Sequence, residues 1–541
     1  MAHIRFWALA FIALSISATC SGFSLPCDMC EGVLKLIHEG GEHNSSEKFV
    51  VDAVEVICVL SGLSTHRICR AGVEEFYPSL RAVMRRTRLD SKAICSEILD
   101  KSCGSTFTSN WTVNIPPGRT AYVPPQLPKT GSPVVRVLHL ADPHIDHHYA
   151  PGSAVDCGEP QCCRAWLGKG NAGKWGEPEC DVPQALVENM LQHINRADKF
   201  DYTIWTGDIP PHDVWNQTKD GQISMIVSIT KLIQQYLPDR PVYPAVGNHE
   251  SVPVNVFAPE SEKGEFSSQW LYNTLAETWK DWLPASALDT VRHGGFYSLL
   301  HSADLRIISM NFNFCGVLNF WLYVEDRDPY GQLEWLVGEL EQAEKRGEKV
   351  HIIGHIPPGG FSCMRSWSKV YNLIIRRFQN TVKAQFYGHT HKDEMEVFFT
   401  EDDPKIAQPN SIAYIAPSVT TYTGHFPTYR IYDVDGGYAN SSWTVLDHHN
   451  YMCNLTEANI SNEPKWELEY SAREAYGMKS VFPRDWLEFA RRLTLDDDLF
   501  SLYVKHYTHG PKPIPCDSKC RQKFICKILT SSYGDYSHCF I

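Results

Sequence analysis

The sequence predicts an α/β domain that is preceded by an all-helical module and followed by a helical C-terminal region. From about Pro133, short apolar runs that end in polar clusters alternate with amphipathic helical stretches, a pattern typical of an α/β domain. Six cysteines with helical stretches between them lie within residues 23–107, and a cysteine-containing helical tail follows residue 463. A chain of 541 residues is long enough for more than one domain.

The chain begins with a predicted secretory signal peptide, residues 1–22. "MAHIRFWALAFIALSISATCSG" places one arginine before a short apolar stretch that ends in small residues. That stretch is too short and too rich in serine for a good membrane span. We therefore expect an exported protein that is secreted, lysosomal or both.

Composition and charge exclude a nucleic-acid partner. Hydrophobic content of 43% and charged content of 21% are ordinary for a globular protein. The net charge of −13 opposes binding to a phosphate backbone. Many of the 23 histidines would protonate near pH 5, so the protein would approach anionic lipid more readily in an acidic compartment.

Cysteines and glycosylation motifs agree with export. In an exported protein, most of the 18 cysteines are expected to form disulfides. Six Asn-x-Ser/Thr motifs predict glycosylation at several sites; they are Asn44, Asn110, Asn216, Asn440, Asn454 and Asn459.

Residues 23–107 are predicted to form the helical module. "EKFVVDAVEVICVLSGL" and "GVEEFYPSLRAVMRR" repeat apolar residues at intervals of three and four. The sequence alone leaves the pairing of the six cysteines open. Their spacing resembles that of the saposin B-type fold, a small helical lipid-interacting module. This resemblance implies the pairs Cys27–Cys103, Cys30–Cys95 and Cys58–Cys69.

Residues 108–132 are rich in proline, which favours extended geometry and indicates a semi-rigid linker. The α/β domain is expected over residues 133–462. Its predicted strands include "VVRVLHLAD", "DYTIWTGD", "PVYPAVGNHE", "GFYSLL", "LRIISMNF", "KVHIIGH", "KAQFYGHTH", "SIAYIAP" and "TYRIYDVD". "VPQALVENMLQHI" and "GQLEWLVGELEQAEK" are predicted helices. In residues 463–541, "EPKWELEYSAREAYG" and "PRDWLEFARRL" are also predicted helices.

Five polar clusters follow apolar runs of the α/β domain. They are Asp142-x-His144, Gly207-Asp208, Gly247-Asn248-His249-Glu250, Gly354-His355 and Gly388-His389-x-His391. Because alternate side chains of a strand share one side, His389 and His391 would aim at one point. The order of these clusters resembles that of the calcineurin-like metallophosphoesterases, whose fold is a β-sandwich flanked by helices.

That resemblance implies a site with two metal ions. Two ions about 3.5–4 Å apart neutralise a phosphodiester and lower the pKa of a bound water. Asp208 would bridge them, because a carboxylate has two charged oxygens. The implied ligands are Asp142, His144 and His391 for one ion and Asn248, His355 and His389 for the other. The ligand types suit zinc but leave manganese or iron open.

Further polar residues stand beside the expected ligands. His249 follows Asn248, and His212 lies four residues after Asp208. The resemblance implies that His249, with His212, protonates the leaving oxygen, a role that contributes ~10²–10⁴-fold. We expect Glu250 to orient a neighbour. His147, His148, His448 and His449 match no cluster and are predicted to lie at the surface.

The whole arrangement of helical module, linker, α/β domain and cysteine-containing tail resembles the acid sphingomyelinase family. "GDIPPHDVW", "GNHESVPVN", "GHIPPG" and "APSVTTYTG" agree beyond the metal clusters. The family resemblance implies two Zn²⁺ per chain and hydrolysis of sphingomyelin to ceramide and phosphocholine by a metal-activated water. It also implies that Tyr422 lies near the phosphate, and that the helical module rests on membranes or lipoprotein surfaces. We expect a monomer.

The same resemblance implies five further disulfides, Cys157–Cys162, Cys163–Cys180, Cys315–Cys363, Cys516–Cys520 and Cys526–Cys539, and leaves Cys453 unpaired. Three alternatives remain. A related phosphodiesterase acting on nucleotides or other soluble phosphodiesters would share every ligand but typically lacks the helical module. A purple acid phosphatase needs a tyrosine soon after the Gly-Asp cluster, which "GDIPPHDVW" lacks. A non-catalytic lipid-transfer or scaffolding protein is disfavoured because no metal ligand is missing.

Overall fold

The computed structural model describes residues 25–42, 47–99, 103–104, 109–197, 199–511 and 514–539. The expected signal peptide and the motif at Asn44 lie outside these residues. Within them, no helix is both long and apolar enough to cross a membrane.

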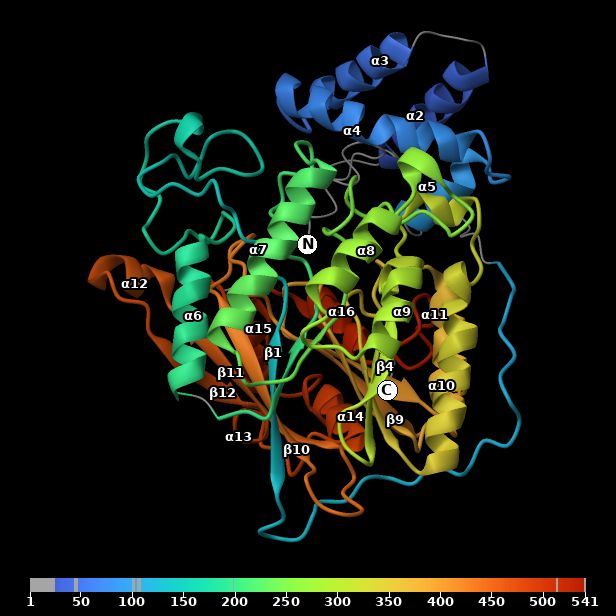
Figure 1. The fold of residues 1–541 in the computed structure, drawn as a ribbon, viewed down its shortest axis with the longest axis vertical. Helices are drawn as coiled ribbons and strands as arrows, with labels where there is room; N and C mark the ends of the chain where they lie inside the picture. The colour runs from blue at the N-terminus through green and yellow to red at the C-terminus, as the bar shows by residue number, and fades with distance from the viewer. Residues whose placement is uncertain are drawn as a thin grey trace.

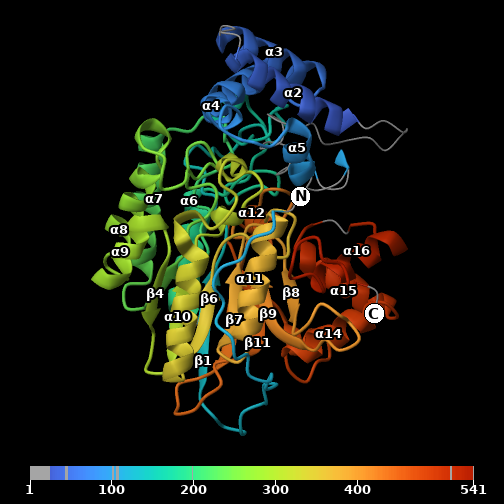
Figure 2. The same ribbon diagram turned by 90° about the vertical axis from the view of Figure 1, so that its right-hand side faces the viewer.

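The N-terminal module is helical, as expected. It consists of α2 (Leu25–Glu42), α3 (Glu47–Leu60), α4 (His66–Met84) and α5 (Ser91–Leu99). Each helix buries one apolar face, and three disulfides tie the helices together. The module lies at one end of the molecule, above the α/β domain in Figures 1 and 2.

The module is packed directly on the α/β domain. The ring of Phe76 on α4 meets that of Phe320 edge-on, with centroids 6.4 Å apart. Phe320 begins the short 3-10 helix η5 (Phe320–Tyr323). Thr87 donates a hydrogen bond to the carbonyl of Tyr323, and Arg86 pairs with Glu262. Apolar and polar contacts together therefore fix the module against the domain.

The linker follows the surface of the α/β domain. Residues 109–133 form no helix or strand. Arg377 Nε donates to the carbonyl of Pro116 at 2.9 Å, and Gln379 Nε2 donates to the carbonyl of Thr120 at 2.9 Å. The segment runs down one side of the domain before entering its first strand (Figure 1).

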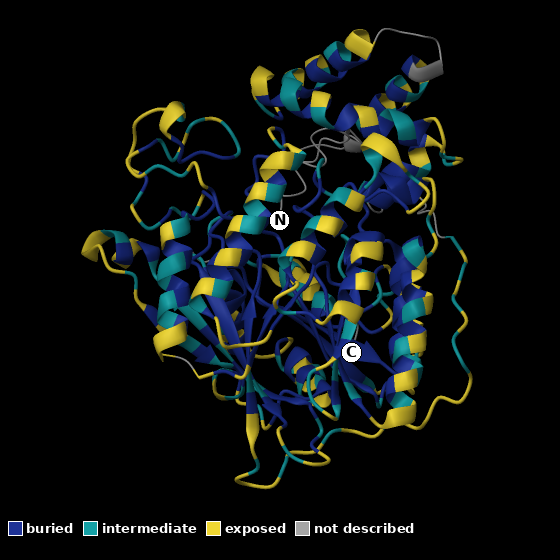
Figure 3. Ribbon diagram, viewed as in Figure 1, coloured by how far each residue is buried: buried dark blue, intermediate teal, exposed yellow. Residues whose placement is uncertain are grey.

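Two six-stranded sheets form the expected β-sandwich. One has the order β12-β11-β10-β1-β2-β3 and the other β4-β5-β6-β7-β9-β8. The strands are β1 (Val134–Leu140), β2 (Tyr202–Trp205), β3 (Val242–Pro244), β4 (Tyr297–Leu300), β5 (Leu305–Ser309), β6 (Lys349–Ile353), β7 (Val382–Tyr387), β8 (Glu394–Phe399), β9 (Pro409–Ile415), β10 (Thr428–Asp435), β11 (Val445–Cys453) and β12 (Trp466–Ser471). β1, β2 and β3 are parallel, as are β5, β6, β7 and β9. The space between the sheets is buried (Figure 3).

Helices flank the sandwich. They are α6 (Gln184–Ala197), α7 (Lys219–Tyr236), α8 (Gln269–Thr278), α9 (Ala285–Gly294), α10 (Gln332–Arg346), α11 (Arg365–Arg377), α12 (Leu455–Ser461), α13 (Ala472–Ala475), α14 (Pro483–Arg492), α15 (Asp497–Thr508) and α16 (Ser518–Ile528). α10 packs on β6, and the C-terminal helices α14 and α16 pack on β8 and β9 (Figure 2). The C-terminal region is thus part of the same body as the sandwich.

The prediction of a helix over "EPKWELEYSAREAYG" is wrong for most of that stretch. Trp466–Ser471 is the edge strand β12, and only Ala472–Ala475 is helical. Trp466 and Tyr470 are buried while Glu467 between them is exposed. The alternation of apolar and charged residues in "WELEYS" has the period of a strand. This alternation therefore predicts a strand here, not the helix given above.

Eight disulfides join cysteines of the described residues, and they are the eight pairs implied by the family resemblance. Cys453 is a free, buried cysteine, and burial raises the pKa of its thiol to about 12. That thiol is therefore held in its unreactive protonated form.

The prediction that His448 lies at the surface is wrong, whereas His147 and His148 are exposed. His448 is fully buried on the inner side of β11, with Nε2 3.2 Å from the hydroxyl of Tyr470. Its neighbour His449 points the other way and pairs with Asp433. Adjacent residues of a strand face opposite sides, so two successive histidines cannot share one environment.

The glycosylation motifs differ in accessibility. Asn110, Asn216 and Asn440 are exposed. Asn454 caps α12, accepting from two backbone N–H groups. Asn459 donates from Nδ2, the atom to which a glycan would be attached, to the carbonyl of Gly176 at 3.0 Å. The first three motifs are therefore better placed for modification than the last two.

Candidate metal centre and active site

The five polar clusters meet at one end of the sandwich. They follow β1, β2 and β3 of one sheet and β6 and β7 of the other. Because parallel strands end at the same edge of a sheet, the loops that follow them gather at that edge. The structure brings together all seven expected metal ligands there.

Several of these residues adopt left-handed backbone conformations. The φ angles are 49° at Asp142, 37° at His144, 59° at Asp208, 71° at His389 and 59° at His391. Such values are uncommon for residues other than glycine and are typical of functional sites. These backbone conformations turn the side chains of the five residues toward the centre of the site.

Glycines allow the clusters to approach one another closely. A Cβ added at Gly388 would lie 2.4 Å from Asp142 Oδ2, and one at Gly247 would lie 2.1 Å from Asp208 Oδ1. Both glycines have ordinary φ angles, since neither is among the residues with positive φ. They are required for close approach rather than for a sharp turn.

His144 and His391 form one half of the site. His144 Nδ1 donates to the carbonyl of Pro210 at 2.7 Å, and His391 Nδ1 donates to the carbonyl of Tyr422 at 2.9 Å. In the neutral rings both Nε2 atoms then carry lone pairs, and these atoms are only 3.2 Å apart. Burial and the neighbouring His144 lower the pKa of His391 well below its usual value. Two facing lone pairs repel each other, and a cation between them would remove that repulsion.

His355, His389 and Asn248 form the other half. His355 Nδ1 donates to the carbonyl of Thr206 at 2.7 Å. Its Nε2 lies 2.8 Å from Asn248 Oδ1 and 3.2 Å from His389 Nδ1. Burial alone would lower the pKa of His355, but the Asp208 carboxylate raises it to about 9. Positive charge is thus favoured here as well, and a metal ion can take the place of the proton.

Asp208 lies between the two halves. Its Oδ2 is 3.3 Å from His144 Nε2 and 3.1 Å from His355 Nε2. Burial would raise its pKa, but the charge of His355 and the hydrogen bonds from His144 and His355 hold the pKa well below the usual value. Asp208 therefore remains ionised, as a ligand shared by two cations must be.

Asp142 completes the set. Its Oδ1 lies 3.7 Å from His391 Nε2 and 3.9 Å from His355 Nε2 and accepts from the backbone N–H of His389 at 2.7 Å. Burial raises its pKa to about 7. Its Oδ2 is buried and has no hydrogen-bond partner among the described residues. This orphaned oxygen is a further atom that a cation would satisfy.

The donor set fits a pair of divalent cations. Ligand atoms of a tetrahedral zinc ion, about 2.0–2.1 Å from the metal, lie about 3.3 Å from one another. The nitrogen–nitrogen separations of 3.2 Å in both halves match that spacing. Two groups of candidate metal-binding residues, His144–Asp208–His249 and Asp208–His355–His389, share Asp208.

His212 is held by a residue that the sequence analysis missed, Asp181. His212 Nδ1 lies 2.8 Å from Asp181 Oδ1, and its backbone N–H donates to Asp181 Oδ2 at 2.7 Å. Thr420 Oγ1 also donates to Asp181, at 2.9 Å. Burial would raise the pKa of Asp181, but the charge of His212 lowers it, so the carboxylate stays ionised. His212 Nε2 is buried without a partner among the described residues.

His249 has a different environment. Its ring centroid lies 4.8 Å from that of His212 and 4.6 Å from that of His144. Burial lowers its pKa well below the usual value, although Asp208 opposes this. Its backbone N–H donates to Asp208 Oδ1 at 2.9 Å. Without substrate, His249 is therefore neutral.

Two other expected residues border the site. Glu250 Oε1 accepts from the backbone N–H of Ile209 at 2.9 Å, and burial raises the pKa of Glu250 to about 8. It thus supports the loop after Asp208. Tyr422 is buried, with its ring centroid 4.3 Å from that of His212. Its carbonyl is the partner of His391 described above.

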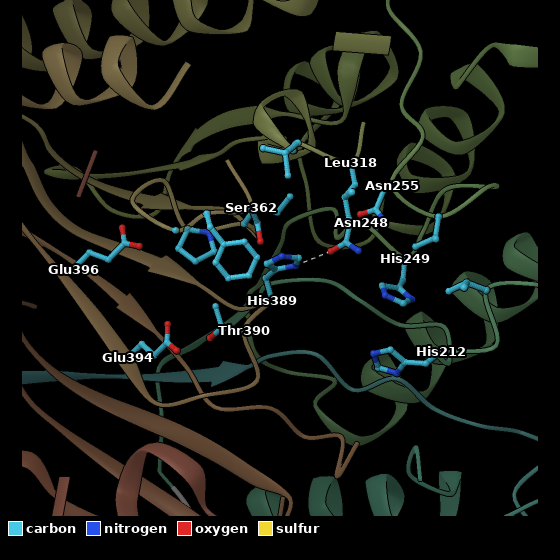
Figure 4. Close-up of a pocket in the computed structure, with 18 of the residues that line it drawn as sticks. His212, Asn248, His249, Asn255, Leu318, Ser362, His389, Thr390, Glu394 and Glu396 are labelled. Carbon is cyan, nitrogen blue, oxygen red and sulfur yellow. Dashed lines mark hydrogen bonds between the residues drawn. The ribbon is translucent and has the colours of Figure 1, made fainter. Parts of the chain in front are cut away.

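A largely apolar pocket opens beside the metal centre. Figure 4 shows His212, His249, Asn248 and His389 at one side of it and Glu394 and Glu396 at the other. Val214, Val254, Val317, Leu318, Ile356 and Phe361 are among the residues that line it. Lys527 on α16 pairs with Glu394. The pocket can therefore accept a substrate with both an anionic group and apolar parts.

Comparison with known proteins agrees with this geometry. Residues 135–393 match the calcineurin-like phosphoesterase family, and residues 408–541 match the acid sphingomyelin phosphodiesterase C-terminal region. Sphingomyelin phosphodiesterase of Homo sapiens is 43% identical over 518 residues, covering 94% of this chain and 82% of that protein. The Bos taurus protein of the same name is 43% identical over 530 residues, covering 96% of this chain and 84% of that protein.

A cyclic GMP-AMP phosphodiesterase of Rattus norvegicus is 32% identical over 440 residues, covering 77% of this chain and 94% of that protein. The match to the human and bovine proteins is both closer and longer. This chain belongs to the sphingomyelin phosphodiesterase family, within the calcineurin-like metallophosphoesterases.

Proposed function

We propose that the protein hydrolyses sphingomyelin to ceramide and phosphocholine. The observation that carries this proposal is the packing of a disulfide-linked helical module directly on the metallophosphoesterase domain. The relatives named for sphingomyelin align with 94–96% of the chain, whereas the cyclic GMP-AMP relative covers 77%. The apolar pocket supports the same assignment.

The seven clustered residues would hold two divalent cations. Asp208 would be shared, with Asp142, His144 and His391 on one side and Asn248, His355 and His389 on the other. When bound, such ions neutralise the phosphate and lower the pKa of a water that can attack it. The nitrogen-rich donor set favours zinc.

His212 would protonate the departing ceramide oxygen. Its Nε2 has no partner among the described residues, and Asp181 behind it holds the ring through Nδ1 at 2.8 Å. His249 lacks such a carboxylate partner of its own. We assign it to binding the phosphate, whose negative charge would favour its protonation. Tyr422 would hold the ring of His212 and lie near the phosphate.

The helical module would rest on a sphingomyelin-bearing membrane or lipoprotein surface. Phe49, Val56 and Leu60 of α3 are 60%, 54% and 82% exposed. Their spacing of seven and four places them on one face of the helix. This exposed apolar face suits insertion into the lipid interface. The protein would act as a monomer in the lysosome, outside the cell, or both, with glycans at its exposed motifs.

A comparison of substrates tests the proposal. The purified protein is given sphingomyelin in detergent micelles and, separately, soluble nucleotide diesters, across pH 4–8, with and without a chelator. We expect preference for sphingomyelin, best activity at acidic pH, and loss of activity with the chelator. Preference for the nucleotide diester would refute the substrate assignment. Activity that survives complete metal removal would refute the metal site.

A further inference from the structure

A disulfide-bonded loop beside the site carries an exposed tryptophan. The loop spans residues 147–183 and contains the disulfides Cys157–Cys162 and Cys163–Cys180. At its tip, the 3-10 helix η2 (Ala165–Leu167) leaves Trp166 59% exposed. No other tryptophan of the described residues is among the exposed large hydrophobic residues. The ring of Trp166 lies against the guanidinium of Arg164, 5.6 Å from its centroid, and against the ring of His148, with centroids 5.1 Å apart, and the rest of the indole faces solvent.

The stem of the loop is held rigidly while its tip is left outside. Arg164, next to the tip, is only 3% exposed. Its Nε donates to Asp146 at 2.8 Å and its Nη1 donates to Asp213 at 2.8 Å. Asp146 lies two residues after His144 and Asp213 directly follows His212. The tip is thus fixed with respect to the active site.

The loop is also joined to the helical module. Arg67 of α4 donates from Nε to Glu159 at 3.0 Å. The loop rises at the same end of the molecule as the module (Figure 1), and its tip is drawn as exposed in Figure 3. Module and loop therefore border the same end, next to which the pocket opens.

The composition of the tip indicates what covers it. "AWLGKGNAGK", residues 165–174, contains two lysines and no carboxylate, in a protein of net charge −13. Lys169 and Lys174 are both exposed. Tryptophan with adjacent lysines is the composition of segments that sit in the headgroup region of a bilayer, especially one with anionic lipid.

We propose that the tip of this loop, Ala165–Lys169, is a second membrane contact, in which Trp166 enters the interface and Lys169 meets anionic headgroups. Together with the apolar face of α3, it gives two separated points of contact. Two contacts restrict the molecule to rotation about the line that joins them, whereas one contact leaves it free to pivot in every direction. This inference rests on the proposed action at a lipid surface and goes beyond it in assigning a role to the loop.

The test uses the full-length glycosylated protein with vesicles of sphingomyelin and phosphatidylcholine, with or without phosphatidylserine. Trp166→Ala should weaken vesicle binding by about tenfold, as expected when an indole leaves an interface. Trp166→Phe should restore most of the binding. Lys169→Glu should weaken binding to vesicles with phosphatidylserine and leave binding to neutral vesicles unchanged. Leu495→Ala is the matched control, because Leu495 is 89% exposed but lies between α14 and α15.

Hydrolysis of a soluble nitrophenyl phosphodiester should be unchanged in all four variants, since none of these residues lines the pocket. Vesicle binding by Trp166→Ala equal to that of the unaltered protein would overturn the inference. So would equal losses in Trp166→Ala and Leu495→Ala. The proposed function fails separately, if the unaltered protein does not hydrolyse sphingomyelin in detergent micelles, where no bilayer contact is needed.

Discussion

Asp181 offers the sharpest test of how the site works. Asp181→Asn keeps the size of the side chain but removes its charge. In the structure the carboxylate accepts from the Nδ1 and the backbone N–H of His212 and from Thr420. An amide has one oxygen and one NH₂ group, so it cannot accept from all three donors. The substitution therefore removes a charge-assisted hydrogen bond that orients His212 for proton donation.

The size of the effect follows from that bond. A hydrogen bond to a charged group contributes about 1.5–3 kcal/mol, which corresponds to about a 10- to 150-fold loss of kcat. The loss should depend on the leaving group. Ceramide leaves as a basic alkoxide and needs a proton, whereas 4-nitrophenolate leaves readily without one. We expect the full loss with sphingomyelin and little loss with a nitrophenyl phosphodiester.

Steady-state kinetics on both substrates measure this difference, and thermal unfolding shows that the variant is folded. Thr420→Val is the matched control, because it removes only a neutral hydrogen bond to Asp181 and should have a smaller effect. Equal losses on both substrates would refute the reasoning, since they would mean that Asp181 supports the structure of the site rather than proton donation.

Three further predictions concern the metal centre, its packing and the helical module. Asp208→Asn should lower the metal content of the purified protein, measured by elemental analysis, from two ions per chain to one or none, while folding is retained; two ions in the variant would contradict the shared-ligand assignment. Gly388→Ala should reduce activity at least tenfold, because its Cβ would lie 2.4 Å from Asp142 Oδ2; unchanged kinetics would show that the loop can shift. Burial raises the pKa of Glu75 on α4 from 4.5 to about 7, so this residue should destabilise the fold increasingly as pH rises from about 4.5 to 7. Glu75→Gln should therefore leave the unfolding temperature unchanged at pH 4 and raise it at pH 7.5. The corresponding gain in the free energy of unfolding at pH 7.5 is about 1–2 kcal/mol, after allowance for the partial exposure of Glu75. An equal rise in unfolding temperature at both pH values would exclude titration as the cause.

The sequence contained the information for the sandwich and for the metal centre because both depend on local patterns. Each expected ligand follows an apolar run, and the chain order of the clusters is enough to identify the set. Asp181 was missed because a single aspartate after a cysteine has no distinctive pattern, and only the fold brings it to His212. The edge strand Trp466–Ser471 was misread although its alternation was visible. His448 shows the same limit, because its burial depends on which side of β11 faces the core.

The attachment of the linker to the α/β domain has a consequence for its length. Between the module and β1 the chain follows a curved route along a surface, and its carbonyls accept from Arg377 and Gln379 on the way. Its length is therefore matched to a path rather than to a straight-line distance. Added residues would bulge into solvent and leave both ends where they are. Removing a few residues would break the hydrogen bonds of the linker to those two side chains and pull the module away from its contacts with the α/β domain. We therefore expect shortening to be tolerated far less well than lengthening.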